Sequence, residues 1–275
     1  MTSLRVPVEE SVYSKQASLV IFNQLALKIE MDRVSNEAYY GWLDHMIATI
    51  GQKVRGAKIV EKENARVAPP LNTAIYYDTA GHHILRTGAL LRTSCNKITH
   101  AFCAFKMAED AHAVRKDHRY VFADDEKRTI QNAPSSSEAV AIVKRLLARK
   151  DIEHPGTFLE RYYGIRGEEL SPAIMLDDYR YTFFAWLDNK DALRCSIDRA
   201  FVSDLRLPEH ERERKPVSEV ELAIYPRITP EVAKDQRVVE LINTLATSLT
   251  DAFNVRITKD IKYQRSAKAL DILRS

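Results

Sequence analysis

Charged side chains alternate with apolar ones along several strand-like segments of the sequence. Lys28 and Glu30 alternate with leucine, isoleucine and methionine in residues 27–32, and Arg194 and Asp198 lie in a similar pattern in residues 193–198. Successive side chains of a strand point to opposite faces, so each segment predicts one apolar and one charged face. Charges of both signs on several such faces favour a water-filled interior enclosed by the strands. The simpler interpretation is an open antiparallel sheet whose polar face lies in bulk water.

A small barrel can enclose such an interior when its lumen binds a polar ligand. The basic candidates for the lining are Lys28, Arg86, Arg92, Lys106, Arg115, Arg119, Arg180, Arg194 and Lys262, and the acidic candidates are Glu30, Asp32, Asp198, Glu219 and Glu221. Converging guanidinium groups repel one another unless an anion neutralises them, and their geometry matches phosphate oxygens. Carboxylates beside them would hold Mg²⁺ or Mn²⁺. The pattern therefore favours a phosphate chain and a divalent ion. The sequence has no glycine-rich phosphate loop, so side chains would hold the phosphate.

The elements that must position these residues are mostly strands, with a few amphipathic helices between them. Expected strands cover residues 19–34, 72–78, 83–94, 98–107, 112–122, 176–187, 192–203 and 217–226, and residues 55–64 form a short strand or a loop. Expected helices begin at Ser35, near Pro134 and at Thr229, with one or two helical turns at 157–164. The strands do not alternate regularly with helices, which disfavours a doubly wound parallel sheet. We therefore expect an α+β protein with an antiparallel barrel and attached helices.

Composition excludes several classes of protein. The chain has 275 residues, of which 45% are hydrophobic and 29% charged, as in globular proteins. A net charge of +3 gives no argument for a nucleic-acid partner. Three cysteines without a CxxC pair disfavour a disulfide framework and a structural zinc site. With no signal peptide and no membrane segment expected, we predict a cytoplasmic protein formed by one domain over residues 1–275.

The order and spacing of eight short motifs resemble the CYTH-like superfamily of triphosphate tunnel enzymes, and within it the VTC domain of polyphosphate polymerases. The matching pieces are Leu27-Lys28-Ile29-Glu30, Ile75-Tyr76-Tyr77-Asp78-Thr79 (similar to YFDT), residues 85–92 (similar to LRxxGxxLR), Lys106, Arg180 in a YxRxAF-like strand, residues 193–198 (similar to vRxSxD), Glu219-Val220-Glu221-Leu222 (similar to EIEL) and Ile261-Lys262-Tyr263 (similar to SKY). Together they cover about residues 20–268.

The resemblance implies an eight-stranded antiparallel tunnel with a basic lumen and helices packed outside. It implies phosphate ligands at Lys28, Arg86, Arg92, Lys106, Arg180, Arg194 and Lys262, and an Mn²⁺ or Mg²⁺ ion on Glu221 with Glu219 or Glu30. Three positions depart from the family pattern. The first strand lacks an intact ExExK motif, Ser94 replaces an arginine, and Ile261 replaces the serine of SKY. The loss of ExExK disfavours a cyclase or an ordinary CYTH triphosphatase.

The resemblance favours a VTC-like polyphosphate polymerase that acts on a nucleoside triphosphate or on polyphosphate. If the acceptor is a phosphate oxygen, no general base is needed, whereas attack by water requires a carboxylate to orient or deprotonate it. A triphosphatase therefore remains an alternative. A tunnel that binds triphosphate or polyphosphate without catalysis is another, because Ser94 removes one expected phosphate ligand.

Overall fold

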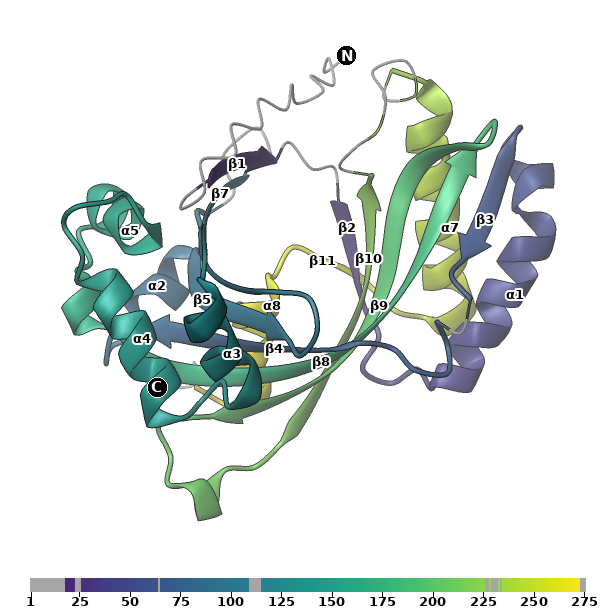
Figure 1. Cartoon of the computed structure of the whole chain (residues 1–275). Coiled ribbons are helices and arrows are strands. Elements are labelled where there is room, and N and C mark those ends of the chain that lie inside the picture. The colour runs from purple at the N-terminus through teal and green to yellow at the C-terminus, as the bar shows by residue number, and fades with distance from the viewer. Residues whose placement is uncertain are drawn as a thin grey trace.

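One antiparallel sheet organises the chain (Figure 1). The structure is a computed structural model that describes residues 18–22, 26–63, 65–108, 115–225, 228, 232 and 234–272. Ten strands follow one another in hydrogen-bonded order: β1 (Ser18–Phe22), β7 (Arg115–Val121), β6 (Ala101–Lys106), β5 (Leu90–Asn96), β4 (Leu71–Asp78), β8 (Ser171–Leu187), β9 (Lys190–Asp204), β10 (Lys215–Ile224), β2 (Ala26–Glu30) and β11 (Ile257–Thr258). A further strand, β3 (Ala57–Glu61), pairs with the second half of β8.

The sheet is open, which corrects the prediction of a closed eight-stranded barrel. In the described part of the chain β1 and β11 end the strand order and do not pair with each other. The expected continuous strand over residues 19–34 is two strands, of which β1 pairs with β7 and β2 pairs with β10. In Figure 1 the sheet curves like a trough, with β7 and β2 on opposite sides.

The chain itself keeps the two margins of this trough close together. Residues 23–25 separate β1 from β2 in the sequence, although the two strands lie near opposite ends of the strand order. Four Cα–Cα steps of about 3.8 Å limit the distance from Phe22 to Ala26 to about 15 Å. At this connection the two margins of the trough therefore cannot lie more than about 15 Å apart.

Helices cover the outer, apolar face of the sheet, as the alternation predicts. The bounds of the helices are α1 (Asn36–Lys53), α2 (His83–Thr87), α3 (Asp124–Asn132), α4 (Ser137–Leu147), α5 (Pro155–Tyr163), α7 (Gln236–Phe253) and α8 (Lys262–Ala269). Trp42 of α1 and Leu245 of α7 pack with Ile29, Ile197 and Leu222 of the sheet in one core. A second core joins α4 and α5 to β4, β5 and β6.

Helix α8 lies on the inner face, where it covers a third apolar cluster. Its Tyr263 stacks on Tyr76 of β4 with a centroid separation of 4.5 Å, and the Tyr263 hydroxyl donates a hydrogen bond to Asp78. Ile174 of β8 and Val202 of β9 complete this cluster. The inner face is therefore apolar beneath α8 and charged farther along β8, β9 and β10.

One further expected element is wrong. The segment expected as a strand over residues 83–94 is helix α2 followed by β5, which begins at Leu90. The helix expected from Thr229 is described only in part: residues 229–231 and 233 lie outside the described residues, Val232 is helical, and α7 begins at Gln236 with Asp235 as its N-cap. The basic C-terminal segment contains α8. None of the helices in the described ranges is long and apolar enough to span a lipid bilayer.

We predict that the buried cap of α5 makes stability depend on pH. The Gly156 N–H donates to His154 Nδ1, and His154 Nε2 lies 2.9 Å from the Arg149 carbonyl, so this ring is neutral. Burial lowers the pKa of His154, so the unfolded chain takes up a proton first as the pH falls. His154→Ala should cost about 1 kcal/mol at pH 7, the usual value of an N-cap. It should also flatten the decrease in unfolding free energy between pH 7 and pH 5.

Denaturant titrations at several pH values measure both effects. The matched control is His210→Ala, because His210 is an exposed histidine in the short helix Glu209–Glu211. An unchanged pH slope in His154→Ala would contradict the assignment.

Candidate functional site

Register places most of the predicted cations on the inner face of the sheet. Lys28 of β2 is opposite Glu221 of β10, which is opposite Ser196 of β9. Arg180 of β8 is opposite Asp198 of β9. The inner-face positions alternate with buried apolar residues that pack under the outer helices. They include the predicted site residues Lys28, Glu30, Arg92, Lys106, Arg180, Arg194, Glu219 and Glu221.

Arg86 does not belong to this set. It lies in α2, is exposed, and its Nε donates to the carbonyl of Gly81 at 3.2 Å. The expected strand through this position is a helix, because the turn around Gly81 and the left-handed Gly88 delimit one short helical segment. Side-chain positions of Arg115 lie outside the described residues.

Asp198 is the centre of a buried ionic cluster. Its side chain is 0% exposed, and Arg180 holds it through two hydrogen bonds of 2.7 and 2.6 Å. Lys262, at the start of α8, forms an ion pair with the same carboxylate. Burial alone would raise the pKa of Asp198, but the charges of Arg180 and Lys262 hold it well below its usual range. Asp198 is therefore ionised, and it neutralises part of the positive charge of the inner face.

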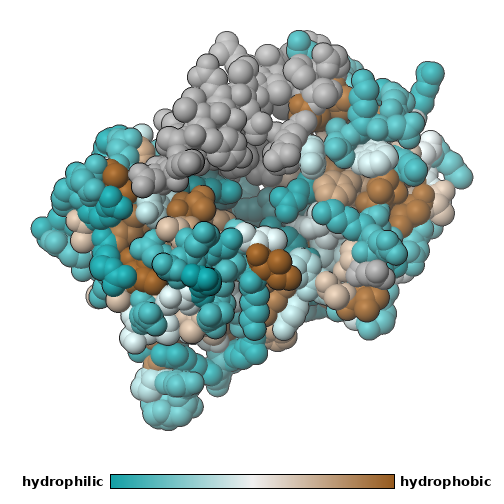
Figure 2. All heavy atoms as spheres, viewed as in Figure 1, coloured by the Kyte–Doolittle hydropathy of each residue, from teal (hydrophilic) through white to brown (hydrophobic). Residues whose placement is uncertain are grey.

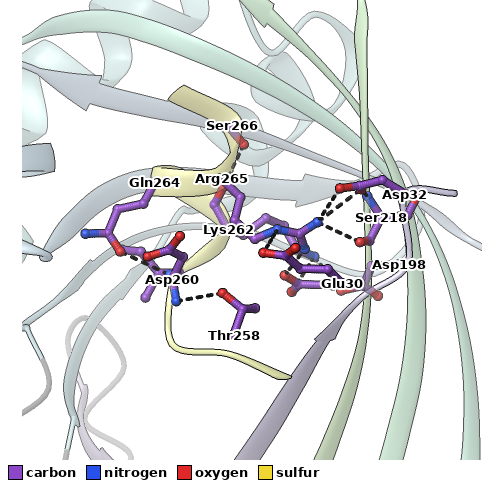
Figure 3. A network of polar contacts seen from close by, with 12 residues as sticks. Glu30, Asp32, Asp198, Ser218, Thr258, Asp260, Lys262, Gln264, Arg265 and Ser266 are labelled. Carbon is purple, nitrogen blue, oxygen red and sulfur yellow. Dashed lines mark hydrogen bonds and ion pairs between the residues drawn. The ribbon is translucent and has the colours of Figure 1, made fainter. Parts of the chain in front are cut away.

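Lys262 and Arg265 extend this cluster to the carboxylates of β2 and β10 (Figure 3). Lys262 Nζ lies 3.2 Å from Asp178 and 3.4 Å from Glu219. Arg265 donates to Glu219 at 3.1 Å and to both oxygens of Asp32 at 3.0 Å. The acids of this cluster are already matched with cations. The resemblance implied that Lys262 binds phosphate, whereas in the structure its ammonium group binds carboxylates.

Asp178 is the least satisfied acid of the cluster. Its Oδ2 accepts from Lys262 and Arg180, while Oδ1 is buried and has no hydrogen-bond partner among the described residues. Burial and the nearby charge of Asp198 raise the pKa of Asp178. The sequence analysis missed Asp178 and Arg265. Asp178 lies two residues before Arg180 on the same strand, so strand alternation predicts that both face the same side. Arg265 lies three residues after Lys262, so a helix over this C-terminal segment would place both side chains on one face.

Three other inner-face cations have no such partner. Lys28, Arg92 and Arg194 form no ion pair or hydrogen bond with a carboxylate in the described ranges. The Nε of Arg92 is buried and lacks any hydrogen-bond partner there. Partial burial and the like charge of Arg180 lower the pKa of Arg194. These three side chains on β2, β5 and β9 therefore lack a direct ion pair, although the charge of Glu221 acts on Lys28 and Arg194.

Lys106 and Glu221 show that the two walls of the trough face each other. Lys106 Nζ lies 3.3 Å from Asp117 on β7, which also accepts from Arg119 at 2.8 Å. Burial lowers the pKa of Lys106 to about 8; Asp117 opposes that shift, and so does Glu221 from β10. Lys28 and Arg180 outweigh the effect of burial on Glu221 and lower its pKa. Glu221 is therefore an ionised carboxylate among cations. Figure 2 shows a hollow in the molecule between the two groups of helices.

The three acids predicted as metal ligands do not form one site. Glu30 pairs with Arg256 at 2.8 Å, and Glu219 pairs with Arg265. Glu221 lies two residues from Glu219, among Lys28 and Arg180. No group of three or more His, Cys, Asp or Glu side chains in the described ranges is arranged to hold a metal ion. The donor set of this arrangement therefore does not fit a divalent ion.

We predict that Asp198→Asn strongly destabilises the protein. The substitution removes the carboxylate that both Arg180 and Lys262 contact most closely and leaves them Asp178 as the remaining shared acid, which should cost about 3–5 kcal/mol. The stabilisation from Asp198 is present above its unfolded pKa of about 3.9 and is lost as the pH falls through its lowered folded pKa. Denaturant unfolding at pH 7 and pH 3 should show a smaller difference between variant and wild type at the lower pH. The control is Asp177→Asn, whose carboxylate is half-buried and pairs with Arg214; an equal loss in both variants would contradict the assignment.

Comparisons with solved structures bear on the fold. A Bacillus halodurans protein described as a "putative adenylate cyclase" aligns with a TM-score of 0.52 and 13% identity, covering 89% of this chain and 97% of that chain. A Hippeastrum protein, described as an adenylyl cyclase with a dominant triphosphatase activity, aligns with a TM-score of 0.47 and 12% identity over 92% and 96% of the two chains. No protein-family model and no curated protein sequence matches the chain. The first likeness shows that the two chains share a fold, although the sheet of this chain is open in its described part.

Proposed function

We propose that the protein binds a triphosphate group, or the end of a polyphosphate chain, along the inner face of the trough and transfers its terminal phosphoryl group. The observation that carries this proposal is the set of three unpaired cations, Lys28, Arg92 and Arg194. Like charges on one face of a curved sheet repel one another unless an anion is bound. A linear triphosphate has the charge and the length to contact side chains from several strands at once.

The geometry of the cations suits a phosphate ligand. Arginine presents its donors in a planar fork that matches two phosphate oxygens. Arg92 has a buried Nε without a partner, so a bound oxygen there would satisfy an orphaned donor. Lys106 and Arg180 lie on the same face and add charge to the ligand site, although each also contacts an acid. Lys262 would affect the ligand indirectly, because it neutralises carboxylates that would otherwise repel a phosphate.

Two acceptors are compatible with this site. Attack by the terminal oxygen of a phosphate chain needs positioning and charge neutralisation rather than a base, and it produces polyphosphate. The VTC-like motifs favour this reaction. Glu221 favours hydrolysis as the second candidate, because its ionised carboxylate lies among the cations and can orient a water molecule. The description of the Bacillus halodurans protein as a cyclase also concerns a nucleoside triphosphate, which agrees with a triphosphate ligand here.

We predict that tripolyphosphate raises the melting temperature and that Arg194→Ala abolishes much of this rise. At a concentration about 100 times Kd, binding stabilises the folded state by about 2.7 kcal/mol. Arg194 is a charge-assisted donor without a competing acid, so its removal should weaken binding about tenfold or more. Thermal shift measurements with tripolyphosphate, ATP and polyphosphate test this.

Arg86→Ala is the matched control, because Arg86 is exposed in α2 and should not contribute. An Arg194→Ala protein that binds tripolyphosphate as the wild type does would exclude the proposed site. A wild type that binds tightly without turnover would instead identify a sensor.

We predict that Glu221→Gln separates the two reactions. If Glu221 orients water, its loss should slow orthophosphate release by about 10²- to 10⁴-fold, the usual contribution of a general base. Polyphosphate synthesis from ATP should continue, and binding should persist because a negative charge facing a polyanion has been removed. Product analysis by gel and phosphate assay distinguishes the outcomes, with the exposed Glu213→Gln as control. Unchanged orthophosphate release would show that Glu221 has no such role.

A further inference from the structure

Two cations of helix α8 occupy the acidic part of the inner face. Lys262 and Arg265 are three residues apart, so they lie on the same side of the helix. Arg265 is 5% exposed and Lys262 is nearly as buried. Together they contribute two positive charges, the same as one divalent ion.

Each of these cations contacts three carboxylates. Lys262 Nζ contacts Asp178, Asp198 and Glu219. Arg265 contacts Glu219 and Asp32 directly, and its Nε lies 4.0 Å from Glu30. Glu219 bridges the two cations, since Oε1 faces Lys262 and Oε2 faces Arg265. Acids from β2, β8, β9 and β10 therefore converge on side-chain cations.

We infer that Lys262 and Arg265 take the place of a divalent metal ion on these carboxylates, so that the inner face of the trough binds its phosphate ligand without a metal. The part of this inference that concerns a phosphate ligand rests on the proposed function. The part that concerns the metal rests only on the ion pairs of Lys262 and Arg265. It assigns α8 a role that is electrostatic as well as structural. Two of the three carboxylates that resembled metal ligands, Glu219 and Glu30, contact these cations, whereas Glu221 lies outside the cluster.

The contacts show why a metal ion would compete poorly. Mg²⁺ binds one or two carboxylates directly, at about 2.0–2.1 Å, and keeps several water molecules. The relevant oxygens of Glu219 and Asp32 already accept hydrogen bonds from Arg265, which stays charged at any accessible pH. An ion placed between them would also be repelled by the two side-chain cations. Withdrawing α8 to make room would break the Tyr76–Tyr263 stack and the hydrogen bond from Tyr263 to Asp78.

The direct test measures Mn²⁺ binding to the full chain without phosphate. We expect the wild type to show no saturable Mn²⁺ binding in the micromolar range by calorimetry or electron paramagnetic resonance. Arg265→Ala should increase Mn²⁺ affinity by about tenfold or more, because it frees Glu219, Asp32 and Glu30. Lys262→Met is the second variant and should act in the same direction through Asp178 and Asp198.

Arg256→Ala is the matched control. Arg256 also pairs with Glu30, but its side chain is 80% exposed, so its removal vacates no buried position. We expect no gain of Mn²⁺ binding in this variant. Micromolar Mn²⁺ binding by the wild type would overturn the inference, and this measurement needs no variant to fold.

A second measurement compares tripolyphosphate binding by the wild type in EDTA and in Mn²⁺. We expect affinities that agree within about threefold. Binding that is lost in EDTA and restored by Mn²⁺ would overturn the inference while supporting the proposed function. No binding of tripolyphosphate in either condition would reject the proposed function, and Mn²⁺ binding alone would then decide whether α8 replaces a metal.

Discussion

The compensation of buried charge on the inner face is the constraint on which the rest of the structure depends. Asp198 is completely buried, and Arg180 and Lys262 converge on it from a neighbouring strand and from α8. Ionised groups are removed from water at a cost of several kcal/mol each, which only close partners with complete hydrogen bonding can offset. The sheet must therefore curve, and α8 must lie inside it, so that acids and bases from distant parts of the chain meet.

This arrangement reverses the usual distribution of polarity in an antiparallel sheet. The apolar faces of the strands are turned outward under α1, α4, α5 and α7, while the charged faces are turned toward one another. Near α8 the acids contact cations directly, with Asp178 Oδ1 as an unsatisfied atom, whereas Lys28, Arg92 and Arg194 form no ion pair in the described ranges. The inner face therefore has two parts. The ion pairs at α8 stabilise the fold, and the region of Lys28, Arg92 and Arg194 can accept an anion.

The charged inner face could be predicted from the sequence because strand alternation is a local property. Lys28, Glu221, Arg180 and Arg194 each alternate with apolar neighbours, and that pattern survives in the structure. The partners of each charge could not be predicted, since they depend on which strands pair and on where α8 docks. Arg86 was misplaced because its apolar neighbours Ile84 and Leu85 fit a short helix as well as a strand. The open sheet was missed because nothing local to residues 19–34 showed that the two halves of this segment pair with different strands.

The short connection between β1 and β2 limits the width of the trough between its two margins. Backbone hydrogen bonds fix the spacing of neighbouring strands in the described sheet. The distance between β1 and β2 is limited only by the length of the three residues between them. Each residue inserted between β1 and β2 would increase the greatest possible distance between these strands by up to about 3.6 Å without disturbing any strand pairing. An insertion or deletion between β1 and β2 would therefore change the greatest possible separation of the two margins of the trough, a freedom that a closed barrel lacks.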